Sequence, residues 1–128
     1  MAEPVTDEEF TSTLRLDVNG RYAYFLERVC EKGQVWALRD DGGFVMMGDD
    51  LGEQFVPVWP SERFAAAYAS PGERPEAIPL DAWIERWLPG LKRDNSGIAI
   101  FPTADCSGAV VEIDEHKLDL EEELSDDQ

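Results

Sequence analysis

Few side chains in this sequence could carry nucleophilic or acid–base catalysis. It holds one histidine, His116, and two cysteines, Cys30 and Cys106. A Ser/His/Asp or Cys/His arrangement needs a histidine, so His116 would have to act as its base. His116 begins a strongly acidic C-terminal segment, and we expect it to be an exposed surface side chain that would meet either cysteine only by coincidence of folding. The sequence therefore predicts no catalytic residue and no cofactor, and an enzyme is the less favoured interpretation.

Two pairs of aspartates offer a different chemistry, the oxygen ligation of a hard cation. Asp40-Asp41 and Asp49-Asp50 each stand in a short Asp/Gly cluster between apolar runs. Carboxylates on turns can bind Ca²⁺, but this spacing does not match a twelve-residue calcium loop. Two carboxylates could also serve as acid and base in glycoside chemistry, which would require a cleft. Turn formation and solubility explain the aspartates without a metal, so no metal ligand is predicted. A metal-binding, ligand-binding or enzymatic site at these turns stays as an alternative.

Tryptophans could anchor a protein partner, because tryptophan and arginine are enriched in binding hot spots. Core packing is the simpler explanation for most of the four tryptophans, since each buries a large apolar area. The candidate partner-binding residues are Trp36, Arg39, Asp40, Asp41 and Trp59. For Arg39 the competing interpretation is an ion pair with the two aspartates beside it.

The stretch from Val35 to Pro60 must position these residues. It predicts three short strands, Val35–Arg39, Phe44–Met47 and Gln54–Trp59, joined by two tight acidic turns. Asp and Gly suit such turns because they tolerate positive φ. The strands are apolar at both alternating positions, so we expect helices or loops to cover much of both faces.

Helices are predicted on both sides of this stretch. Thr6 and Glu9 match the pattern of a capping box and predict a helix to about Arg15. A second helix carries an apolar stripe at helical spacing and ends at Gly33. The further predicted helices are Ser61–Ala69, a helix capped by Asp81 and limited by Pro89-Gly90, and a helix from about Glu115 to Leu124 capped by Asp114.

A strand pair and a loop complete the predicted fold. Gly97–Phe101 and Ala109–Ile113 predict a strand pair, and proline-rich Ser70–Pro79 predicts a surface loop that could bind a ligand. The sum is an α+β fold: one domain over residues 1–124, with about five mostly antiparallel strands (a three-stranded meander plus a hairpin) and four or five helices. Residues 125–128 are predicted to be a disordered acidic tail.

The charge of the chain limits its partners. It has 28 acidic and 11 basic residues, a net charge of −17. This disfavours direct binding to nucleic acid or to anionic lipid, both of which need clustered Lys and Arg. The simplest explanation for the negative charge is that it keeps the protein soluble. The alternatives are that the charge attracts a basic partner or that the protein mimics the surface of a nucleic acid. The acidic N-terminus predicts no signal peptide, and no apolar run is long enough to span a membrane. We therefore expect a soluble cytoplasmic protein with reduced cysteines.

An ordered set of short motifs resembles a known family, the bacterial domain-of-unknown-function family 2750. The resemblance runs from about Asn19 to Leu124 and implies a small single-domain, cytosolic bacterial protein. It implies no activity and no catalytic residues. The motifs are Arg21-Tyr22-Ala23-Tyr24-Phe25-Leu26, Val35-Trp36-Ala37-Leu38-Arg39-Asp40, Val58-Trp59-Pro60, Ile78-Pro79-Leu80, Trp87-Leu88-Pro89-Gly90-Leu91 and Ile100-Phe101-Pro102-Thr103.

These observations favour a protein-binding module without catalytic activity. Its expected partner is a basic protein, by analogy with immunity proteins that bind nuclease toxins. An acidic ligand or metal site at the hairpin turns and a nucleic-acid mimic are the alternatives. An exposed edge strand, Gln54–Trp59 or Ala109–Ile113, could also pair between copies, so the sequence leaves the oligomeric state open.

Overall fold

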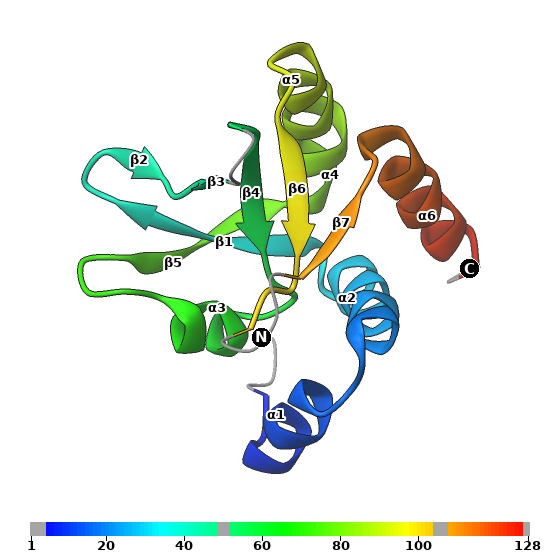
Figure 1. Cartoon of the computed structure of the whole chain (residues 1–128). Coiled ribbons are helices and arrows are strands. Elements are labelled where there is room, and N and C mark those ends of the chain that lie inside the picture. Colours follow the sequence, from blue (N-terminus) through cyan, green and yellow to red (C-terminus); the bar gives the residue numbers. More distant parts are fainter. Residues whose placement is uncertain (1–4, 49–51, 104–107, 127–128) are drawn as a thin grey trace.

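The computed structural model describes residues 5–48, 52–103 and 108–126 of the chain. Figure 1 shows two β-sheets that meet near the middle of the molecule, with helices packed around them. The predicted α+β class is therefore confirmed. The helices are α1 (Asp7–Leu14), α2 (Val18–Lys32), α3 (Glu62–Tyr68), α4 (Leu80–Ala82), the π-helical turn η1 (Trp83–Trp87), α5 (Leu88–Arg93) and α6 (Ile113–Asp126). The strands are β1 (Gln34–Asp40), β2 (Gly43–Phe44), β3 (Met47–Gly48), β4 (Gln54–Val58), β5 (Arg74–Pro79), β6 (Gly97–Ile100) and β7 (Ala109–Val111).

The central stretch is divided between the two sheets instead of forming one three-stranded meander. One sheet has the order β2-β1-β5 and is antiparallel throughout. The other has the order β3-β4-β6-β7, in which β4 and β6 are parallel. The predicted strand Phe44–Met47 is split, because its first residue pairs with β1 and its last with β4. The local pattern could not reveal this, since the parallel partner of β4 lies some forty residues further along the chain.

A backbone bridge between two tryptophans connects the sheets. The Trp36 N–H donates to the Trp59 carbonyl at 2.9 Å, and the Trp59 N–H donates to the Trp36 carbonyl at 2.8 Å. Trp36 lies within β1, and Trp59 directly follows β4. The two sheets therefore meet at residues that the sequence placed in strands.

The first helix begins at its predicted cap, Thr6, and the second ends at its predicted stop, Gly33. The Thr6 hydroxyl accepts the Glu9 N–H at 3.1 Å. Asp17 caps α2 in the same way, accepting the Gly20 N–H at 2.7 Å. Gly33 ends α2 with φ at 77°, in the left-handed region that glycine adopts without strain.

The predicted loop Ser70–Pro79 is wrong over most of its length, because Arg74–Pro79 forms β5. Its register with β1 runs from Arg74 opposite Arg39 to Pro79 opposite Gln34. β5 is the outer strand of its sheet, where one row of N–H groups faces away from the ladder. A proline can replace a residue in that row without removing a hydrogen bond, so Pro75 and Pro79 fit an edge strand.

The helix predicted to start at Asp81 is longer than expected. It begins at Leu80 and continues through Pro89 and Gly90 to Arg93. The turn before the proline is π-helical, and the Leu88 N–H donates to the Trp83 carbonyl five residues earlier. Such a wider turn changes the hydrogen-bond pattern just where Pro89 has no N–H to donate. The helix therefore passes Pro89-Gly90 through a local π-bulge instead of ending there as predicted.

The C-terminal part follows the prediction more closely. β6 and β7 form the expected antiparallel pair, with Ile98 opposite Val111. Helix α6 starts one residue before the predicted cap, Asp114, and extends to Asp126. Ser125 and Asp126, which were predicted to lie in a disordered tail, belong to α6. Residues 127 and 128 lie outside the described part of the chain, so for them the tail stays a prediction.

One hydrophobic core holds these elements together, and α2 and α6 pack against each other beside it (Figure 1). Its fully buried large side chains come from every layer of the fold: Phe25, Val29, Val35, Leu38, Trp59, Trp83, Leu88, Ile98, Ile100, Phe101 and Leu120.

Candidate functional site

A buried polar cluster centres on His116, the only histidine of the chain. His116 on α6 is 0% exposed and lies between α2 and η1. The Trp83 indole N–H donates to His116 Nε2 at 3.2 Å. On its other side, His116 Nδ1 is 3.2 Å from the Tyr22 hydroxyl, which donates to Asp119 Oδ2 at 2.6 Å. The four side chains form one chain of hydrogen bonds.

The indole fixes the protonation of the imidazole. An indole N–H only donates, so Nε2 must accept and the ring proton lies on Nδ1. The Nδ1–H then donates to the Tyr22 oxygen, whose own proton goes to Asp119. All bonds therefore run in one direction, from Trp83 through His116 and Tyr22 to Asp119.

Burial keeps this cluster neutral at its centre. It lowers the pKa of His116 to about 4, and the nearby Asp119 carboxylate opposes this shift only in part. Burial, followed by the hydrogen bond and the charge of Asp119, raises the pKa of the Tyr22 hydroxyl well above its usual range. His116 is thus a neutral imidazole at physiological pH.

The expectation that His116 is an exposed surface histidine is wrong. Ile113, His116, Leu120 and Leu124 recur at helical spacing along α6, and this inward stripe was the signal that sequence reasoning missed. The acidic residues between them suggested a solvated segment, and Glu115, Glu121 and Glu122 are indeed exposed, but Asp119 joins the buried cluster. A fully buried imidazole cannot contact a substrate, so the cluster acts as a polar part of the core.

Of the two cysteines, only Cys30 lies in the described part of the chain. The Cys30 thiol on α2 lies 3.8 Å from the Leu120 carbonyl of α6, away from the imidazole nitrogens that Trp83 and Tyr22 occupy. Cys106 lies outside the described residues.

The first acidic turn forms as a turn. Asp40 Oδ1 accepts the Gly42 N–H at 2.8 Å, which closes the hairpin between β1 and β2. Asp41 is exposed at its tip. Among the described residues, no three His, Cys, Asp or Glu side chains gather as metal ligands would. Asp49 and Asp50 lie outside the described residues, so the predicted acidic site stays untested.

The candidate partner-binding residues do not share one surface. Trp59 is 0% exposed, and its indole N–H donates to the Pro102 carbonyl at 2.9 Å. Trp36 is half-buried, whereas Arg39 is exposed and lies 3.9 Å from Glu76 on the neighbouring strand. Arg39 also lies 5.4 Å above the Phe44 ring. A fully buried Trp59 offers no surface to a partner, so the remaining candidates are Trp36, Arg39, Asp40 and Asp41.

A groove lies beside β7, where the sequence indicated no site. Its volume is about 500 Å³, and both apolar side chains and carboxylates line it. β7 is the last strand of its sheet, with one strand neighbour, β6, among the described strands (Figure 1). Val110 of β7 borders the groove and is 61% exposed. The lining residues are Glu53, Phe55, Lys92, Asn95, Ser96, Gly97, Val110, Val111, Glu112, Ile113 and Asp114.

These features define a small acidic α+β protein whose one histidine is buried in the core and whose surface carries an open groove. None of the described helices is long and apolar enough to cross a membrane. The chain belongs to the family described as a protein of unknown function, DUF2750, whose model matches residues 22–120. The resemblance seen in the ordered motifs is thereby confirmed. No curated protein matches the sequence.

Proposed function

We propose that the protein is a binding module that captures an extended, basic segment of another protein in the groove beside β7. The observation that carries this proposal is the exposed Val110 on a terminal strand that borders the groove. A terminal strand offers backbone groups to a further strand, and neighbouring pockets then select the side chains of that strand.

The chemistry of the groove supports a segment with apolar and basic residues. Phe55, Val111 and Ile113 supply apolar surface, while Glu112 supplies an exposed carboxylate. Lys92 lies within 2.6 Å of Asp114, so this positive charge is already paired. Apolar side chains of the partner would contact these three apolar residues, and its basic side chains would lie near the carboxylate of Glu112.

The net charge of −17 supports the same class of partner. A charge of this size attracts a basic protein and speeds the encounter, while the groove supplies the specificity. One form of this function is that of an immunity protein, which would bind and block a basic toxin. The acidic site at the hairpin turns and the nucleic-acid mimic stay predictions without a supporting contact among the described residues.

A peptide of alternating valine and lysine tests the proposal. We expect the fluorescence anisotropy of the labelled peptide to rise on binding, and the affinity to fall as salt increases. Val110→Ser should weaken binding about tenfold, because it removes an apolar anchor. Leu118→Ser on α6 is the matched control, since Leu118 is 60% exposed but does not line the groove.

Charge is tested by a second matched pair. Glu112→Lys should weaken binding more than Glu121→Lys, because both residues are exposed but only Glu112 lines the groove. If Val110→Ser binds no more weakly than Leu118→Ser, and Glu112→Lys no more weakly than Glu121→Lys, the peptide responds only to the overall charge and the groove is not the site.

A further inference from the structure

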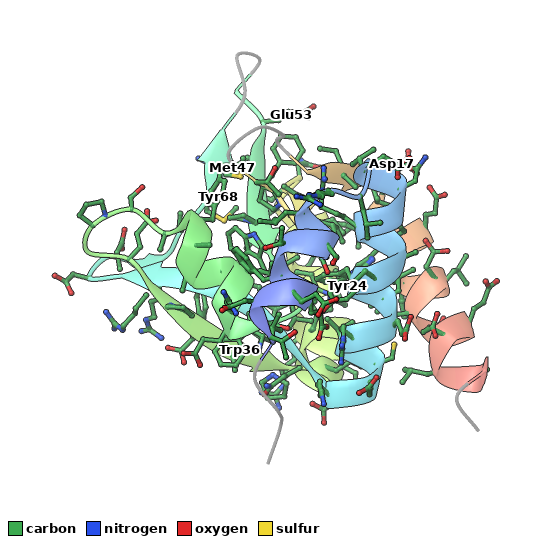
Figure 2. The ribbon with its side chains drawn as sticks, turned by 90° about the horizontal axis from the view of Figure 1, so that it is seen from below. Asp17, Tyr24, Trp36, Met47, Glu53 and Tyr68 are labelled. Carbon is green, nitrogen blue, oxygen red and sulfur yellow. The ribbon has the colours of Figure 1, made fainter. Side chains whose placement is uncertain are left out.

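A second, smaller pocket lies on another part of the molecule, between α1, α3 and the segment that follows β6. Its volume is about 110 Å³. In Figure 2, α1 lies between α3 and α2, and Tyr68 is labelled on the α3 side. The pocket is lined by Phe10, Leu14, Phe64, Ala67, Tyr68, Phe101, Pro102 and Thr103.

Aromatic rings from three segments form its walls. Phe10 of α1 stacks on Phe64 of α3 at 5.1 Å between ring centroids. Phe64 in turn meets Phe101 edge to face at 4.8 Å. Arg63 lies 4.4 Å above the Phe10 ring, where it also binds Asp7 and the Val5 carbonyl. The walls are therefore held by contacts that need no ligand.

Phe101 has an unusual backbone. Its φ is 60°, in the left-handed region that bulky residues rarely adopt. The conformation is held from two sides, because the Phe101 N–H donates to the Val58 carbonyl at 2.8 Å and the Trp59 indole holds the Pro102 carbonyl. Gly108 also approaches closely, since a Cβ there would stand 2.7 Å from the Ile100 carbonyl oxygen. Backbone strain of this kind is common at ligand sites. Here the contacts that impose the strained backbone also keep the Phe101 side chain in the pocket wall.

We propose that this pocket binds one uncharged aromatic ring of about the size of benzene. An apolar protein cavity of roughly 150 Å³ accepts benzene, and this pocket of about 110 Å³ is smaller. Because the pocket is partly open to solvent, a single ring can enter it without being enclosed, whereas the second ring of a fused pair would lie outside. None of the described residues that line it is charged, so a charged ring would lose hydration without gaining a partner among them. Offset or edge-to-face contacts with Phe10, Phe64 and Phe101 would hold the ring.

Such a ring has two sources, a free small molecule or the phenylalanine side chain of a peptide. Benzyl alcohol represents the first and N-acetylphenylalaninamide the second. We expect saturable shifts of the amide NMR signals of α3, Phe101 and Thr103, with a Kd of about 1 mM for a ligand this small. Binding of the alcohol alone indicates a free ligand, and binding of the amide indicates that a peptide side chain also fits.

The matched variants are Ala67→Leu and Ala66→Leu. Both alanines are exposed on α3, but only Ala67 lines the pocket. Leucine is a good helix former, so both variants should fold. Ala67→Leu fills the pocket and should weaken binding at least about tenfold, whereas Ala66→Leu should leave it unchanged.

Probe size and charge complete the test. Benzoate and naphthalenemethanol should both bind much more weakly than benzyl alcohol. The proposal is overturned if neither neutral one-ring probe saturates, if the two leucine variants act alike, or if the fused ring binds as well as the single one. The site is separate from the groove beside β7, so failure of either proposal leaves the other standing.

Discussion

At the scale of single residues, the side chains around His116 decide its protonation state and its tautomer. The same imidazole on the opposite face of α6 would be a solvated base near its usual pKa. Between Trp83 and Tyr22 it is a neutral group with one fixed tautomer. Its role can be measured through the pH dependence of stability.

We expect His116 to destabilise the fold as the pH falls. Its folded pKa of about 4 lies below the value of 6.5 in the unfolded chain, so the unfolded state takes up the proton first. The free energy of unfolding should therefore decrease between pH 6.5 and 4, by about 3 kcal/mol in total. Chemical denaturation at a series of pH values measures this loss.

The matched variant is His116→Gln, which cannot titrate in this range. Tyr22, Asp119 and Glu115 are the titratable groups that act on or near the imidazole, and they are unchanged in the variant. The difference between the two proteins thus isolates the histidine. Parallel pH profiles for both would show that His116 is not protonated on unfolding, contrary to the buried geometry.

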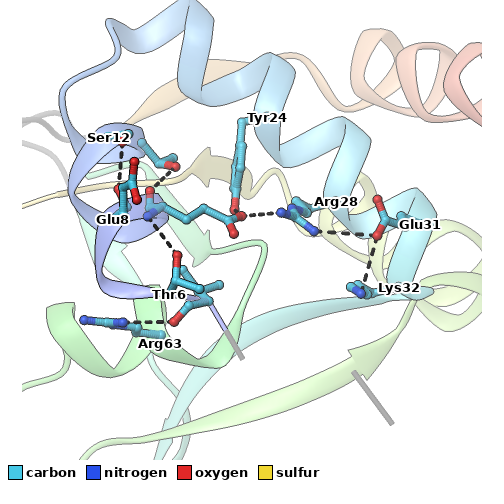
Figure 3. Close-up of polar contacts among 11 residues, drawn as sticks. Thr6, Glu8, Ser12, Tyr24, Arg28, Glu31, Lys32 and Arg63 are labelled. Atoms are coloured by element: carbon cyan, nitrogen blue, oxygen red, sulfur yellow. Dashed lines mark hydrogen bonds and ion pairs between the residues drawn. The ribbon is translucent and has the colours of Figure 1, made fainter. Parts of the chain in front are cut away.

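At the scale of elements, α1 depends on side chains of its neighbours. Figure 3 shows the contacts that hold it, from Arg28 on α2 and Arg63 on α3. Glu9 accepts hydrogen bonds from Arg28 and from the Tyr24 hydroxyl. Burial and the bond to Glu9 raise the pKa of Tyr24 to about 12. Glu9 therefore binds α2 instead of completing the capping box at Thr6.

We predict that Glu9→Ala loosens α1 from α2. The amide hydrogens of α1 should exchange faster, corresponding to a loss of about 1–2 kcal/mol, since the contacts are charge-assisted but only partly shielded from water. Glu8→Ala is the control, because Glu8 is exposed and no contact of its carboxylate to α2 is among those described. Equal acceleration by both variants would mean that Glu9 contributes only through its negative charge in the first turn of α1.

At the scale of the whole molecule, charge opposes folding. The net charge of −17 is spread over a small protein, and the carboxylates of α6 lie close together near the negative end of the helix dipole. The first turn of α6 carries acids as well, but there they meet the positive end of the dipole. The two ends of the helix should thus respond differently to the loss of charge.

We predict that sodium chloride stabilises the protein, because it screens repulsion between carboxylates. Moving from low to physiological salt should raise the free energy of unfolding by about 1 kcal/mol, measured by thermal denaturation. The triple variant Glu121→Gln, Glu122→Gln, Glu123→Gln should be more stable at low salt and less sensitive to salt. Asp114→Asn at the start of α6 is the contrasting control, since it removes a charge that favours the helix. A wild type that salt destabilises would contradict the prediction.

Local sequence predicted most of the elements, and it failed where a partner lies far along the chain. The caps at Thr6 and Gly33 and the pair β6–β7 follow from short-range hydrogen bonding. The division into two sheets does not, because β4 pairs with β6 and β5 pairs with β1 across long separations. The groove beside β7 was missed for the same reason, since its lining comes from three separate segments, 53–55, 92–97 and 110–114.

The sequence by itself determined the α+β class, the family, the acidic surface and the ends of the first helices, because these depend on composition and on neighbours within a few residues. Only the tertiary structure decided that His116 is buried, that Trp59 is not available to a partner, and that Phe101 stands strained beside a pocket. Those properties depend on which distant side chains surround a residue, and distant pairing sets a local environment that no short pattern contains.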